Sequence, residues 1–125
     1  MSLPDNWNSE DPEHPIPSPG RIDVFVTTKE GSTYYGLVVA APLRADMRSQ
    51  RRLLQKLEDY MSDRHSEKLL LRFGDPTPMN TKLIAAIHPG SEPGIFALLE
   101  RCRPWLEQNG FALKVTTVPE VFGLH

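Results

Sequence analysis

The chain has 125 residues, of which 39% are hydrophobic and 24% charged, with a formal net charge of −2. This size and composition predict one globular domain, and no apolar run approaches the roughly 20 residues that a membrane span needs. The single cysteine excludes an internal disulfide, and the N-terminus lacks the pattern of a secretory signal, so we predict a cytoplasmic protein with no membrane contact.

Residues 1–20 differ in character from the rest of the chain. They contain acidic residues and no Lys or Arg, and their prolines favour extended backbone without a core of its own (Asp5, Glu10, Asp11 and Glu13; Pro4, Pro12, Pro15, Pro17 and Pro19). We therefore predict an acidic, proline-rich tail over residues 1–20, a single α/β domain over 21–118, and a C-terminal tail over 119–125.

The domain opens with a predicted β-hairpin. Residues 22–28 and 33–41 are rich in β-branched and aromatic side chains, and residues 29–32 read as the turn between them. Asp46 is placed to cap a helix that runs to about Asp63, with one apolar face (Met47, Leu53, Leu54, Leu57, Tyr60 and Met61).

The second half of the domain is also predicted to contain strands and a helix in succession. Residues 68–73 are predicted as a short strand or a packed loop, and residues 81–88 as a strand that is apolar on both faces. Ser91 is the predicted cap of a helix from about 92 to 109, which Pro104 should kink or restart.

Gly110 then stands where a helix ends with positive φ, and residues 111–118 form the last predicted strand. The fold class is therefore α/β, in the form of an α+β two-layer sandwich. A mixed sheet of four or five strands carries two helices on one face, because each crossover is right-handed. The order is β-β-α-(β)-β-α-β, which becomes ferredoxin-like if residues 68–73 form a strand.

The run Leu53-Leu-Gln-Lys-Leu-Glu-Asp-Tyr60 follows a paired strand, and a later strand ends in His88-Pro89. In these features the chain resembles a family of small bacterial proteins that share a Leu-Gln-Lys-Leu-x-x-Tyr helix and are classed as a domain of unknown function. The resemblance covers about residues 22–118. It implies the fold class, and it implies no activity and no site residue.

Few residues of the sequence suggest a catalytic or metal-binding role. Cys102 falls on the apolar stripe of the second helix, which indicates a core thiol rather than a nucleophile. His88 ends a strand, where catalytic groups of α/β proteins often lie, and Asp23 or Glu92 are its weak candidate partners. Asp63, His65 and Glu67 could together bind a metal ion if the backbone of residues 63–67 is extended. We predict no catalytic residue, no metal site and no cofactor.

The most distinctive feature is a basic face on the first helix, made by Arg44, Arg48, Arg51, Arg52 and Lys56. No acidic residue lies between Met47 and Leu57 to balance it. Three interpretations stay open: a solvated surface, a binding site for an anionic partner such as RNA or an acidic protein, or a seat for the protein's own acidic tail. No aromatic pair is interleaved for base stacking, so nucleic acid is disfavoured.

Two helices cover one face of the predicted sheet, and its central strands are apolar on both faces. A second copy of the chain is the simplest cover for the other face. We therefore predict a non-enzymatic protein–protein interaction module that acts as a homodimer, with small-anion or RNA binding on the basic face as the alternative.

Overall fold

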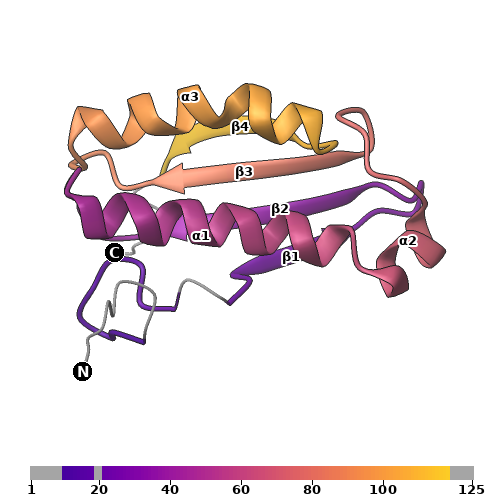
Figure 1. The fold of residues 1–125 in the computed structure, drawn as a ribbon, viewed down its shortest axis with the longest axis horizontal. Helices are drawn as coiled ribbons and strands as arrows, with labels where there is room; N and C mark the ends of the chain where they lie inside the picture. The colour runs from indigo at the N-terminus through magenta and orange to yellow at the C-terminus, as the bar shows by residue number, and fades with distance from the viewer. Residues whose placement is uncertain (1–9, 19–20, 119–125) are drawn as a thin grey trace.

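The computed structural model describes residues 10–18 and 21–118. Its elements follow the order β1 (Val24–Thr27), β2 (Thr33–Val39), α1 (Met47–Arg64), α2 (Glu67–Phe73), β3 (Thr81–Ile87), α3 (Pro93–Gln108) and β4 (Ala112–Thr117). The strands lie side by side in this order; β1 pairs with β2 antiparallel, and β2, β3 and β4 are parallel. Figure 1 shows α1 and α3 across the same face of the sheet. The predicted mixed sheet with helices on one face is confirmed.

Helix α1 begins where its cap predicts. The carboxylate of Asp46 accepts a hydrogen bond from the backbone N–H of Ser49 at 2.7 Å, which satisfies one of the free donors of the first turn. Leu53, Leu57 and Tyr60 lie on one side of the helix and are fully buried. The 3.6-residue period of these apolar side chains is what places α1 against the sheet.

The prediction of a strand or packed loop at residues 68–73 is wrong, because this segment is helix α2. Ser66 caps it by accepting from Leu69 N at 3.5 Å, and Glu67 places a negative charge in its first turn. The three consecutive leucines look strand-like, yet Leu71 is 82% exposed. The sheet of the described residues therefore has four strands, and the ferredoxin-like order, which required a strand here, is not formed.

Helix α3 also departs from its predicted start. Ser91 is not its cap: the Ser91 hydroxyl instead accepts from the backbone N–H of Leu43 at 3.0 Å. Glu92 occupies the cap position, and its carboxylate accepts from Ala45 N at 2.6 Å. Both side chains thus fasten the loop before α3 to the loop before α1. The helix continues through Pro104.

The core lies between the helices and the sheet. Alternate residues of β2 (Tyr35, Leu37 and Val39) and of β3 (Leu83, Ala85 and Ile87) face the helices and are fully buried. Ile16, from the segment before the hairpin, is 1% exposed and belongs to the same cluster. None of the helices in the described part of the chain is long and apolar enough to cross a membrane.

Candidate functional site

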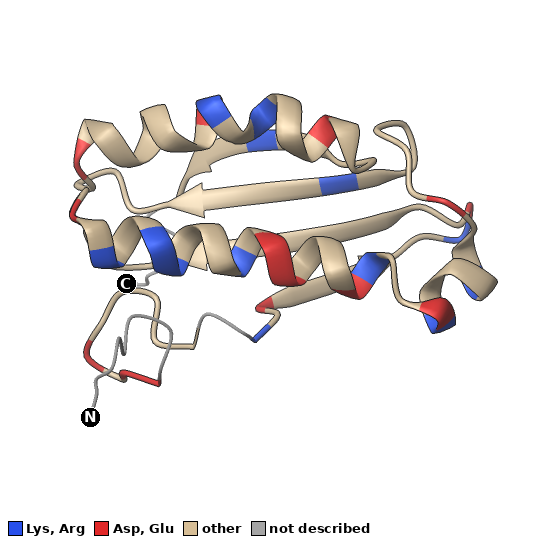
Figure 2. Cartoon of the chain, viewed as in Figure 1, with Lys and Arg blue, Asp and Glu red and all other residues tan. Residues whose placement is uncertain are grey.

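Residues 10–18 lie along the first half of α1, and we call this segment the strap (Figure 1). Arg48 donates from Nη2 to the carboxylate of Asp11 at 2.7 Å. Figure 2 shows most of the Lys and Arg positions of α1 in its first half, on the side of the molecule where the strap and its acidic positions lie. Of the three interpretations of the basic face, a seat for the acidic tail is therefore the one that the contacts of residues 10–18 support. Trp7 of the tail lies outside the described residues.

Arg52 holds the strap at its centre. Its side chain is fully buried and donates from Nε to the backbone carbonyl of Ile16 at 2.8 Å, with Nη2 bonded to the same oxygen. The Ile16 side chain enters the core at this point. A charged donor thus satisfies a carbonyl that would otherwise be buried without a partner.

Lys56, one turn further along α1, connects the strap to the segment just before β1. Its ammonium group is 3% exposed and donates to the carbonyls of Ser18 at 3.1 Å and Arg21 at 2.6 Å. It also forms an ion pair with Asp23 at 3.0 Å. Arg48, Arg52 and Lys56, spaced four residues apart, therefore form a continuous ladder under the strap, which is a loop closed by the hydrogen bond from Asp11 N to the carbonyl of Pro17 at 2.9 Å.

The remaining two predicted site residues lie elsewhere. Arg44 and Arg51 are exposed, and Arg51 borders a hollow between α1 and α3. The five cations therefore do not form one surface: Arg48, Arg52 and Lys56 contact peptide groups or acids of residues 11–23, and Arg44 and Arg51 lie on exposed positions of the chain. Sequence reasoning missed the anchor of the strap, Ile16, although a β-branched apolar residue between two prolines was its visible signal.

His14 adds a titratable contact between the strap and α1. Its Nδ1 accepts from the backbone N–H of Ile16 at 2.9 Å, so the ring proton lies on Nε2, which donates to the hydroxyl of Ser49 at 3.0 Å. Burial, Arg52 and Arg48 together lower the pKa of His14, and the carboxylates of Asp11 and Asp46 oppose them only in part. The docked strap therefore requires neutral His14.

We expect acidification to weaken the strap. Because the folded-state pKa of His14 lies below its ordinary value of 6.5, the contribution is complete above pH 6.5 and is lost as the pH falls through the lowered pKa. An NMR titration should give His14 a pKa below the ordinary histidine value of 6.5. In an Ile16→Ser variant the His14 pKa should rise towards 6.5, and an unchanged value would show that the strap does not determine it.

His88 and its two candidate partners, Asp23 and Glu92, each make contacts that hold the backbone in place. His88 accepts from Gly90 N at 2.9 Å through Nδ1. Asp23 pairs with Lys56 and accepts from Val38 N at 3.0 Å, and the Glu92 carboxylate is bound by Ala45 N. These contacts give each of the three polar groups a structural role.

Cys102 and the suggested metal trio carry no site either. Cys102 is 6% exposed, as predicted, and burial raises the pKa of its thiol. His65 follows the end of α1 and Glu67 begins α2, so the trio is not extended, and Asp63 accepts a 2.6 Å hydrogen bond from Tyr35. Among the described residues no cluster of His, Cys, Asp and Glu could hold a metal.

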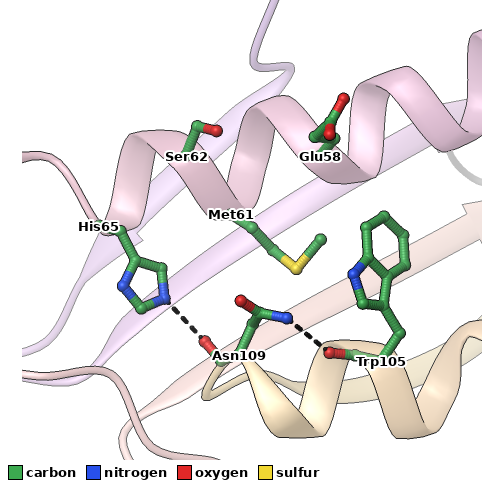
Figure 3. Close-up of a pocket in the computed structure, with 6 residues that line it drawn as sticks. All are labelled: Glu58, Met61, Ser62, His65, Trp105 and Asn109. Carbon is green, nitrogen blue, oxygen red and sulfur yellow. Dashed lines mark hydrogen bonds between the residues drawn. The ribbon is translucent and has the colours of Figure 1, made fainter.

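A groove runs between α1 and α3 on the outer side of the helix layer (Figure 3). Its volume is about 280 Å³, and it is lined by Glu58, Met61, Ser62, His65, Trp105 and Asn109. His65 donates to the carbonyl of Asn109 at 3.0 Å, and the Asn109 amide donates to the carbonyl of Trp105 at 2.9 Å. These bonds close one end of the groove and leave no convergent set of reactive groups.

A second surface is the edge strand β1, whose large side chains are exposed on both faces. A Cβ at Gly36 would lie 3.0 Å from the Cβ of Val24, so Val24 and, two residues on, Val26 project from the sheet face opposite the helices. Phe25 projects to the helix side, with its ring 4.8 Å from that of Tyr35. The three side chains of this edge are 42%, 38% and 48% exposed (Val24, Phe25 and Val26).

Comparison with models of protein families, with curated proteins and with solved structures finds no match to this chain. The class of protein that the fold and surfaces define is a small α+β module with a four-stranded mixed sheet. Its function is therefore argued from its own surfaces.

Proposed function

We propose that this protein is a protein–protein interaction module that acts as a homodimer through the β1 side of its sheet. The observation that carries the proposal is the exposure of Val24, Phe25 and Val26 on an edge strand. An uncovered apolar edge presents unpaired backbone groups and apolar side chains together, which is the arrangement that recruits another strand.

The two edges of the sheet differ in how they are protected. The β1 sequence Val-Phe-Val-Thr contains no charged residue, whereas β4 carries the exposed Lys114. Lysine on an edge strand opposes strand addition because its charge would have to be desolvated. A second copy is the occupant we propose, since two β1 strands related by a two-fold axis pair antiparallel and bury identical side chains.

A hollow beside β1 extends the same surface. It measures about 420 Å³ and is lined on the helix side by Ile22, Phe25, Asp63, Ser66, Lys68 and Leu69. Half of these side chains are apolar, and half could form hydrogen bonds or ion pairs. A partner strand added at β1 would therefore contact Val24 and Val26 on the sheet face opposite the helices. On the helix side it would contact Phe25 and the hollow that Phe25 lines.

The test is the mass in solution. Sedimentation equilibrium at tens of micromolar should give twice the chain mass of 14.1 kDa, a range in which interfaces of ordinary size stay associated. A Val26→Lys variant should shift the population to monomer and weaken dimerisation at least about tenfold, because a charge would have to be buried at the interface.

Met79→Lys is the matched control, since Met79 is 91% exposed in the loop between α2 and β3, outside β1, and gains the same charge. It should remain dimeric. A monomeric wild-type protein at 100 μM, on the order of the weakest standard interfaces, would refute the homodimer, and equal weakening by both variants would refute the β1 interface.

A further inference from the structure

We infer that the ladder of Arg48, Arg52 and Lys56 on α1 is a peptide-binding site that the strap occupies in cis. Its ligand in trans is an acidic segment of a partner protein that folds into a loop, as the strap does, and carries an aliphatic anchor between prolines. The site lies on α1 and does not include β1. It therefore stands or falls separately from the proposed dimer.

The docked strap shows what the site recognises. It takes one aliphatic side chain, Ile16, into the core, and it binds the carbonyl of that same residue through Arg52. It takes one carboxylate, that of Asp11, at Arg48. Prolines on both sides of Ile16 fix φ and have no N–H that must be satisfied, so such a segment loses little entropy on binding.

The architecture makes the strap replaceable. Residues 10–18 belong to no helix or strand, so their detachment breaks no ladder of the sheet. Of the α1 side chains that they cover, Arg48 and Arg52 are cations, which water solvates well once they are exposed. The apolar contribution comes mainly from Ile16. A competing segment with the same anchor can therefore take the same seat without unfolding the domain.

The contacts favour a peptide over a nucleic acid. Phosphate oxygens could accept from Arg52 and Lys56 as the carbonyls of the strap do, but the position of Ile16 is an apolar socket that a phosphodiester strand has no aliphatic side chain to fill. Among the described residues, His14 is the only aromatic side chain in the hydrogen bonds between the strap and α1. Base stacking thus has no platform here.

The experiment uses the full chain and a synthetic peptide of residues 10–18. The Ile16→Ser substitution removes the anchor in cis without adding a charge. Added to this variant, the peptide should shift the backbone amide signals of Ser49 and Arg52 in NMR spectra. In the wild-type protein the tethered strap competes at an effective concentration on the order of millimolar, so apparent affinity should be at least about tenfold weaker.

Two comparisons make the result decisive. A peptide with serine at the Ile16 position should not bind, and Ile16→Val, which shortens the anchor by one methylene and preserves the fold, should give an affinity between those of wild type and Ile16→Ser. If the peptide shifts the Ser49 and Arg52 signals of neither the Ile16→Ser nor the Ile16→Val protein, the inference is wrong. It is also overturned by a single-stranded oligoribonucleotide that shifts the Ser49 and Arg52 signals of the Ile16→Ser protein when the peptide does not.

Discussion

Replacing Gly110 by alanine is expected to lower the free energy of unfolding by about 3–5 kcal/mol, a loss found only where a named steric or conformational conflict exists. Gly110 has φ +88°, and a Cβ there would lie 2.3 Å from the carbonyl oxygen of Pro76. Both obstacles are backbone features, so no side-chain rotation relieves them. The loop before β3 or the turn into β4 would have to move.

Gly31→Ala is the matched control, because Gly31 has φ +90° with nothing within 4 Å of the added carbon. It should lower the free energy of unfolding by only about 1 kcal/mol, which is the cost of placing alanine at positive φ without a steric clash. Thermal unfolding of both variants at equal protein concentration should separate them, with Gly110→Ala lower in Tm by roughly 10 °C or more. Equal Tm values would mean that the Pro76 contact is relaxed at little cost.

Most of the fold could be predicted because its signals are local. Asp46 before an apolar period of 3.6 located α1, and Gly110 located the end of α3 by the positive φ that it adopts. Residues 68–73 could not be assigned from composition, since three leucines suit a strand and a short helix equally. There the capping pattern of Ser66 and Glu67 was the better signal.

The basic face shows why a site is harder to predict than a fold. Helical periodicity placed Arg48, Arg52 and Lys56 on one side of α1, but it could not tell whether water, an anion or the chain itself faced them. The answer depends on contacts more than 30 residues apart in sequence, such as the 36-residue separation between Ile16 and Arg52. A single sequence read locally carries no signal for such pairing.

The second large effect is expected when the strap is released. In the Ile16→Ser variant, Arg52 should become accessible and Arg48 should become available to another anion, because the first is buried under the strap and the second is paired with Asp11. The free energy of unfolding should fall by no more than about 3 kcal/mol, the worth of one buried isoleucine, since the strap can detach while the core stays folded.

Retention on immobilised heparin at several salt concentrations measures this exposure. Each cation that gains an anionic contact steepens the dependence of log affinity on log salt by about one, so release of Arg48 and Arg52 should steepen it by roughly two. Ile16→Val keeps the anchor apolar and should be retained between the wild-type protein and Ile16→Ser. Heparin binds exposed cations whether or not the site recognises a peptide. This measurement therefore tests release of the strap separately from the proposal that a partner peptide takes its place. If the serine variant shows the raised His14 pKa yet elutes with the wild type, the strap has moved without uncovering the cations, and the shielding role assigned to it is wrong.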